Sequence, residues 1–172
     1  MARNAHQQEM VTNKADLKKL LEEEIQLMND KKKALENLQK AQQKELNSVI
    51  SDLKKSGFEF NGNELVRDGV TGGTVADRLL DAQNWANSAT GSEKEWRKKD
   101  TLYLQEKINL YYELVGKVND TNNEIDEMTL AIRKAKKEQE ELLKAVENLA
   151  DRYLQVTMKI KRLDNDLSLN KR

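Results

Sequence analysis

The stretch SGFEFNGNELVRDGVTGGTVADRLLDAQNWANSATG, residues 56–91, decides how this chain folds. It contains six of the seven glycines, both phenylalanines and Trp85. The sequences on either side of it have long helical periodicity with almost no glycine. Glycine clusters between periodic segments mark the turns and loops where a chain changes direction. Residues 56–91 are therefore predicted to form an irregular tip between two long helices that pair antiparallel.

Composition supports an all-α, elongated molecule. Of the 172 residues, 35% are charged and 5% are aromatic, and there is neither proline nor cysteine. Long helices that each bury a single stripe fit this composition better than a globule with a thick core. The 30 basic and 30 acidic residues balance, so no basic excess is present to bind nucleic acid. No apolar run approaches the length of a membrane span, and we expect one elongated domain over residues 1–172.

The first long helix is expected over residues 4–55. Its apolar side chains recur at helical spacing and leave charged residues on the other faces. They are Leu17, Leu21, Met28, Leu35, Leu38, Leu46, Val49 and Leu53. A polar helix of this length needs a partner along its apolar stripe.

The second long helix, residues 92–169, carries a stricter heptad repeat, which predicts a left-handed coiled coil. The a positions are Tyr111, Val118, Ile125, Ile132, Gln139, Val146, Tyr153, Ile160 and Leu167. The d positions are Leu114, Thr121, Met128, Ala135, Leu142, Leu149, Val156 and Leu163. Gln139 is interpreted as a polar residue that fixes the register.

The offset between the two helices is predicted by placing Met10 opposite Leu163. Antiparallel pairing then brings Leu53 near Asp120. Residues 93–116, which are rich in aromatic side chains, would have no partner on the first helix. The tip is expected to pack on them instead.

Within the tip, Phe58 and Phe60 alternate with polar residues, which predicts a β-hairpin with Asn61-Gly62 as its two-residue turn. A short helix should follow, capped by Thr74 with Asp77 three residues later. The segment 69–74 precedes this helix as a phosphate-binding loop would, but it lacks the Gly-Lys-Ser/Thr ending. A flexible connector is the favoured interpretation.

No set of residues suggests catalysis. His6 is the single histidine, and a lone histidine near a chain end is not a metal site. The many carboxylates are expected to be ordinary charge pairs on solvated helices. We expect a non-enzymatic protein with no metal, no cofactor, no nucleic-acid partner and no membrane insertion.

The tip is the predicted contact surface for a protein partner, because interfaces depend on a few aromatic and arginine side chains. Phe58, Phe60 and Trp96 are expected to hold the tip together. The predicted contact residues are Arg67, Asp68, Val70, Thr71 and Arg78.

The pattern of a helical hairpin with a glycine-containing tip resembles the receptor-binding domain of colicin-like bacteriocins, nearest in character to the E-group colicins. The similarity is carried by the opening Ala2-Arg3-Asn4 with Gln7, by Gly72-Gly73 with Trp85 a dozen residues on, and by the close Asn170-Lys171-Arg172. The shaft is also rich in Lys, Gln, Asn and Asp, although the tip is larger and alanines are fewer than in that family.

The resemblance implies a monomeric fragment of a secreted toxin, in which the tip binds an outer-membrane receptor of target bacteria. The alternative is a cytoplasmic coiled-coil scaffold or tether, or a phage structural protein, which would be expected to form a dimer or a mixed assembly. Composition does not distinguish these two classes.

Overall fold

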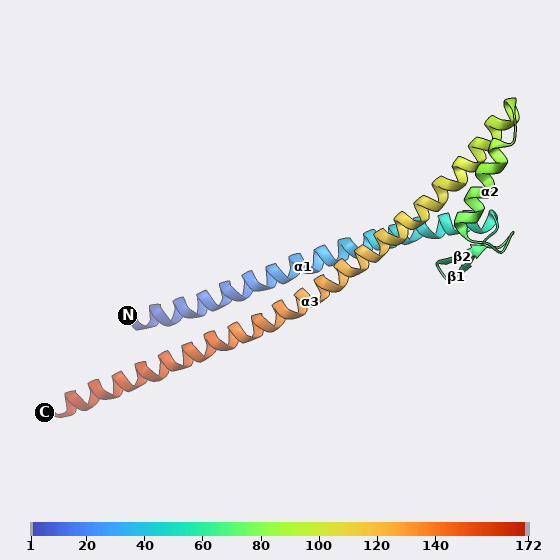
Figure 1. Cartoon of the computed structure of the whole chain (residues 1–172). Helices are drawn as coiled ribbons and strands as arrows, with labels where there is room; N and C mark the ends of the chain where they lie inside the picture. The colour runs from blue at the N-terminus through green and yellow to red at the C-terminus, as the bar shows by residue number, and fades with distance from the viewer. Residues whose placement is uncertain (1, 171–172) are drawn as a thin grey trace. The chain divides into compact units, whose positions relative to one another are not determined.

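The computed structural model describes residues 2–170, with side chains from residue 13 to residue 170. In chain order the elements are α1 (Ala2–Lys55), β1 (Phe58–Asn61), β2 (Glu64–Asp68), α2 (Val75–Asn87) and α3 (Gly91–Asn170), as labelled in Figure 1. The predicted all-α class, with two long helices flanking an irregular tip, is confirmed, and the helix bounds lie within two residues of those expected.

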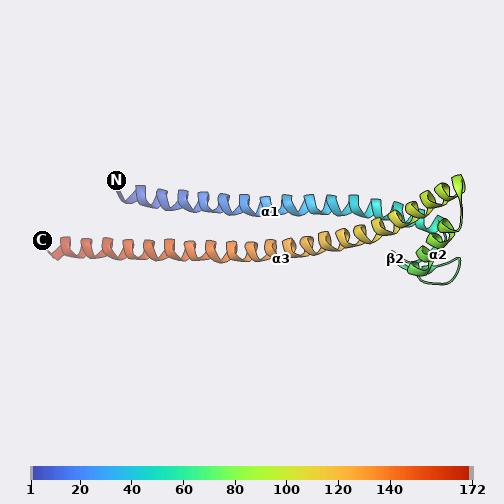
Figure 2. The same ribbon diagram turned by 45° about the horizontal axis from the view of Figure 1, so that its top comes forward.

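The chain divides into two units, and α1 and α3 each contribute to both. Unit 1 contains residues 1–33 and 126–172, and unit 2 contains residues 34–125. In unit 1 the described parts of α1 and α3 run side by side and antiparallel (Figure 2). The Nζ atom of Lys14 lies 2.6 Å from Oε1 of Glu147 across this pair.

The core of unit 2 lies where α1, the hairpin and α3 meet. Its buried members are Leu46, Val49, Ile50 and Leu53 from α1, Phe58 from β1, and Leu104, Ile108, Tyr111, Leu114 and Val118 from α3. Phe60, Leu65, Val75, Leu79 and Ala82 pack against this cluster. The burial of Phe58 and the packing of Phe60 confirm the structural roles expected for both side chains.

The predicted offset between α1 and α3 is wrong by roughly two heptads. Asp52 pairs with Lys107, with 2.7 Å between Oδ2 and Nζ, and Thr121 donates to Gln42 over 2.8 Å. Leu104, Ile108 and Tyr111 therefore pack against α1 rather than only against the tip. A shift of α3 by seven residues keeps a and d residues in the seam, so the heptad pattern alone could not fix the offset.

The heptad itself is confirmed from Tyr111 to Gln139, where every predicted a and d position is buried or half-buried. Beyond Gln139 the pattern changes. Leu143, Val146 and Ala150 are half-buried there, whereas the predicted d residues Leu142 and Leu149 are 43% and 60% exposed.

This change is a stutter in the heptad: the step from Gln139 to Leu143 is four residues long, in place of the expected three. On α1 the half-buried residues Leu17, Leu21 and Ile25 also follow one another by fours. One residue of each step, Ile25 and Gln139, lines a small cleft in unit 1, together with Glu22, Gln26, Lys136 and Glu140. Such an insertion locally unwinds a left-handed supercoil, so Gln139 lies where the coiled-coil seam changes face.

The hairpin forms as expected, but its turn is one residue later than predicted. β1 pairs with β2 antiparallel, with Asn61 opposite Glu64 and a bulge at residues 59 and 60. The turn is therefore Gly62-Asn63, in which Gly62 has a φ of 61°. Glycine at the first turn position is typical of a type II′ hairpin. With the turn at Gly62-Asn63, Asn61 does not need the positive φ that the predicted Asn61-Gly62 turn would have required.

Candidate functional site

The segments of the tip are held together by the buried carboxylate of Asp68, which is 0% exposed. It accepts hydrogen bonds from the amide of Val70 at 3.1 Å and the hydroxyl of Thr71 at 2.6 Å. The guanidinium of Arg78, on α2, lies 3.3 Å from the same carboxylate and 3.5 Å from the carbonyl oxygen of Ser56 at the end of α1. Asp68 thus joins β2, the loop and α2.

The protonation of Asp68 reflects this network. Burial by itself would raise the pKa of the Asp68 carboxyl. The hydrogen bonds from Thr71 and Val70, together with the positive charge of Arg78, outweigh burial and hold the pKa below its usual value. Asp68 is therefore ionised at neutral pH, and Arg78 is paired with a negative charge.

The loop between β2 and α2 uses its amide groups internally. The amide of Gly69 donates to the carbonyl of Gly57, and the amide of Gly73 donates to the hydroxyl of Thr71. Asp68 accepts twice, at its carboxylate from the amide of Val70 and at its carbonyl from the amide of Gly72. Thr74 donates to Asp77 and completes the predicted capping box of α2. A phosphate loop needs free amides that converge on the ligand. This loop is thus a connector, as interpreted, but one fixed by hydrogen bonds rather than a flexible one.

The hairpin is held on α3 by Tyr111. Its hydroxyl donates to the carbonyl of Asn63 over 2.6 Å and accepts from the amide of Leu65 over 3.0 Å. Its ring packs edge-on against Phe60, with 5.5 Å between the centroids. Burial raises the pKa of the Tyr111 phenol, which therefore stays protonated as a donor at neutral pH.

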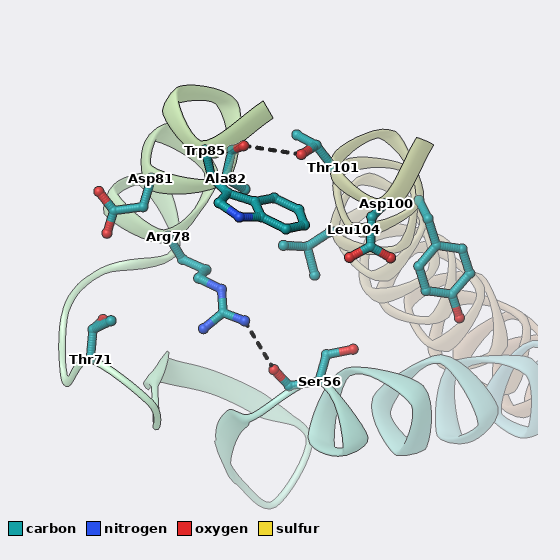
Figure 3. Close-up of a pocket in the computed structure, with 10 residues that line it drawn as sticks. Ser56, Thr71, Arg78, Asp81, Ala82, Trp85, Asp100, Thr101 and Leu104 are labelled. Carbon is teal, nitrogen blue, oxygen red and sulfur yellow. Dashed lines mark hydrogen bonds between the residues drawn. The ribbon is translucent and has the colours of Figure 1, made fainter. Parts of the chain in front are cut away.

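A cleft of about 500 Å³ opens between α2, α3 and the end of α1 (Figure 3). Its lining residues are Ser56, Thr71, Arg78, Asp81, Ala82, Trp85, Asp100, Thr101, Tyr103 and Leu104. The hydroxyl of Thr101 donates to the carbonyl of Ala82 over 3.1 Å and ties α2 to α3. Asp81 and Asp100 are both exposed at this cleft. Because Arg78 is already paired with Asp68, the cleft carries an excess of negative charge.

Beside the cleft lies an exposed aromatic surface formed by Trp85, Trp96 and Tyr103, which we call the aromatic face. The two indoles pack edge-on with 5.6 Å between their centroids and an interplanar angle of 73°. Trp96 is 61% exposed, Tyr103 49% and Trp85 38%. Trp96 and Tyr103 lie seven residues apart on α3, so they share one side of that helix.

Arg97 holds the aromatic face in position. Its guanidinium carbon lies 4.8 Å from the Trp85 ring centre, within the range of a cation–π contact. It donates to the carbonyl of Trp85 at 2.9 Å, to the hydroxyl of Ser88 at 3.1 Å and to Glu93 at 2.5 Å. These bonds join the end of α2 to the start of α3 beside the Trp85 ring.

The structure separates the five predicted contact residues. Val70 is 67% exposed, Thr71 lines the cleft, and Arg67 lies on the outer hairpin in an exposed pair with Glu59 at 2.6 Å. Arg78 lines the cleft but is held by Asp68. Asp68 itself is fully buried, so its prediction as a contact residue is wrong, because its hydrogen bonds hold it beneath the surface.

Sequence reasoning expected Trp96 to help hold the tip together; Trp96 packs against Trp85 but is 61% exposed. Sequence reasoning missed the carboxylates of the cleft and the positioning role of Arg97. The available signal was the spacing of Trp85 and Trp96 on either side of the short α2–α3 turn at residues 88–90, which places two aromatic side chains at adjacent helix ends.

No helix among the described residues is long and apolar enough to cross a membrane. Within the same residues there is no group of three or more histidine, aspartate or glutamate side chains that could hold a metal ion. Comparison with protein-family models, with curated proteins and with solved structures finds no match to this chain.

Proposed function

We propose that the chain is a non-enzymatic binding module that recognises a protein partner through the aromatic face and the adjoining cleft of its tip. The observation that carries this proposal is the exposed pair Trp85 and Trp96, in which the Trp85 ring also contacts Arg97. Exposed tryptophans on a soluble surface are unfavourable unless they serve an interaction, and clustered apolar surface is typical of binding sites.

The residue types fit a protein interface. Tryptophan, tyrosine and arginine dominate the few side chains that supply most of the binding energy. The aromatic face is also pre-organised, because the contacts of Trp85 with Trp96 and Arg97 restrict its side chain before a partner arrives. Pre-organisation lowers the entropic cost of association.

The residues of the cleft support a proposal for the chemical group that the partner presents. Asp81 and Asp100 supply two carboxylates, while the charge of Arg78 is balanced by Asp68. Trp85 and Tyr103 supply aromatic rings beside them. Carboxylates next to aromatic rings suit a lysine or arginine side chain, which can form an ion pair and a cation–π contact together.

The resemblance to colicin-like bacteriocins directs the choice of partner to test first. On that basis we propose an outer-membrane receptor of target bacteria, bound by a segment of a larger secreted toxin. The second candidate is a coiled-coil scaffold or tether, or a phage structural protein. It is favoured by a separate feature, the exposed apolar residues of α3 between Leu142 and Leu167.

The test compares Trp96→Ala and Asp100→Asn with the control Tyr112→Ala. Tyr112 is 55% exposed, close to Trp96, but points to nearly the opposite side of α3 at 100° per residue. Fluorescently labelled chains would be titrated onto a panel of Gram-negative cells and onto their outer-membrane extracts. We expect at least about a tenfold loss of affinity for Trp96→Ala, in line with a central interface residue, and wild-type affinity for Tyr112→Ala.

Two results would count against the proposal in different ways. Wild-type binding by both tip variants would show that recognition lies outside the aromatic face. Binding of the wild-type chain to none of the cells would reject the outer-membrane receptor and favour the scaffold. These point variants are preferable to replacing residues 63–73 with a linker, because that exchange would also remove Asp68 and leave Arg78 unpaired.

A further inference from the structure

The C-terminal part of α3 in unit 1 carries a second apolar surface that is open to solvent. Seven large side chains form it, and each is between 40% and 61% exposed. They are Leu142, Leu149, Tyr153, Val156, Ile160, Leu163 and Leu167, which we call the outer stripe. At 1.5 Å per residue the outer stripe is about 38 Å long. So much exposed aliphatic surface along a charged helix is characteristic of an interaction site.

The outer stripe is distinct from the face that α3 turns toward α1. The half-buried residues of that inner face are Leu143, Val146, Ala150 and Thr157. At 100° per residue their mean direction differs from that of the outer stripe by about 85°. A helix packed on the outer stripe would therefore lie beside α1 without displacing it.

The spacing of the outer stripe selects a helical partner. Its members repeat every seven residues in two sets, with Tyr153, Ile160 and Leu167 at a and Leu142, Leu149, Val156 and Leu163 at d. The stripe continues the heptad that forms the seam with α1 as far as Gln139. Within the stripe the a residue Ile160 is β-branched and three of the four d residues are leucine, a combination that favours parallel two-stranded coiled coils.

We propose that the outer stripe binds the same stripe of a second copy of this chain, in a parallel, in-register coiled coil. The charged residues that flank the stripe favour this arrangement. In a parallel pair, each g residue lies beside the following e residue of the other helix. Lys159 of each copy then lies beside Asp164 of the other, twice in the dimer, and Arg152 lies beside the neutral Thr157.

The antiparallel alternative is less favourable on the same residues. Full antiparallel overlap of residues 142–167 places g residues beside g residues. Arg152 of each copy would then lie beside Lys159 of the other, again twice. Like charges beside a coiled-coil seam oppose pairing, so charge selects the parallel orientation. The proposed dimer differs from the monomer expected from the sequence and does not depend on what the tip binds.

The first test is sedimentation equilibrium of the full chain. The wild type is expected to dimerise at micromolar concentrations. Leu149→Glu and Ile160→Glu should each weaken the dimer by roughly 100-fold or more, because each dimer would place two carboxylates in the apolar seam. The matched control is Leu130→Glu, since Leu130 has the same exposure as Leu149, 60%, but lies off the stripe. Unchanged far-ultraviolet circular dichroism would show that the variants still fold.

The second test fixes the orientation. The chain has no cysteine, so Leu142→Cys and Leu167→Cys each introduce a single thiol at one end of the stripe. A parallel dimer predicts rapid oxidation of each variant to its own disulfide dimer and little mixed product when the two are combined. Preferential mixed disulfide would overturn the parallel arrangement. A wild-type chain that stays monomeric at roughly 100 μM, or a dimer equally resistant to all three glutamate variants, would overturn the proposal as a whole.

Discussion

Replacing Asp68 with asparagine tests whether this one buried carboxylate holds the tip in place. The substitution keeps the shape of the side chain but removes its charge and turns one acceptor oxygen into a donor group. Thr71 and Arg78 would then each face a weakened or missing acceptor. Hydrogen bonds to a charged group contribute about 1.5–3 kcal/mol each, and loss of one partner of a buried ion pair costs about 3–5 kcal/mol. Because Arg78 retains 25% exposure and its bond to Ser56, we expect a destabilisation of the tip near the lower end, about 3 kcal/mol.

The assay follows urea unfolding with two signals. Tryptophan fluorescence reports the tip, because of the two tryptophans Trp85 lies in the tip and Trp96, on α3, packs against it. Far-ultraviolet circular dichroism reports the long helices. The Asp68→Asn variant should lose the fluorescence transition at lower urea than the circular-dichroism transition. The double variant Asp68→Asn, Arg78→Met should recover part of the loss, since it removes the unpaired cation.

The pH dependence provides a check with a definite sign. The pKa of Asp68 is lower in the folded chain than the usual value of about 3.9. A lowered folded pKa means that the stabilisation is complete above the unfolded value and is lost as the pH falls through the folded one. Wild-type tip stability should therefore fall below about pH 4 more steeply than that of Asp68→Asn. A destabilisation under about 1 kcal/mol at pH 7, within the range of an ordinary surface change, would refute the anchoring role.

Three further tests, with five substitutions in all, examine the packing of the long helices and the hairpin. Tyr111→Phe should destabilise unit 2 by about 1–2 kcal/mol, because both hydrogen bonds of the hydroxyl are lost. The control Tyr112→Phe should be near neutral. Equal effects of the two variants in thermal melts would contradict the proposed anchoring of the hairpin by Tyr111. Ile132→Asp, at a 7% exposed position, should lower the free energy of unfolding by about 3 kcal/mol or more. Leu142→Asp, at a 43% exposed position, should lower it by under about 1 kcal/mol when measured at concentrations where the chain is monomeric. Gln139→Leu should raise the melting temperature modestly, because a half-buried polar side chain leaves the seam, and a lowered melting temperature would mean that Gln139 stabilises the stutter.

Local signals in the sequence were sufficient for the elements themselves. Long apolar periodicity predicted both helices, and Thr74 with Asp77 predicted the cap of α2, because these features act over a few residues. The hairpin turn was displaced by one residue because Asn61-Gly62 and Gly62-Asn63 are both acceptable turn sequences. Which of them forms depends on strand pairing, which includes a bulge at residues 59 and 60.

The candidate site was less predictable because it depends on contacts across the fold. From the sequence, Asp68 would be an exposed turn residue. In the structure it is buried and accepts a hydrogen bond from Arg78, ten positions later. Trp96 was expected to help hold the tip together, yet the offset between α1 and α3 buries Leu104, Ile108 and Tyr111 in the core instead. The composition of the tip was informative. Which of its residues face solvent, however, depends on the offset between α1 and α3, and the heptad periodicity does not determine that offset.

The stutter at Gln139 connects these observations to the outer stripe. A straight α-helix has 3.6 residues per turn, so a residue pattern of 3.5 drifts around it by about 20° per heptad unless the helices supercoil. Up to Gln139 the a and d residues of α3 stay in the seam with α1. After it, the residues that face α1 follow the four-residue step, while the sequence continues its strict heptad on an adjacent face. A helix whose only partner is α1 has no physical need to keep leucine, isoleucine and valine at seven-residue spacing on that second face. The proposed second helix would account for the continued repeat, so the oligomeric state of the whole chain is the most informative property to measure beyond the tip.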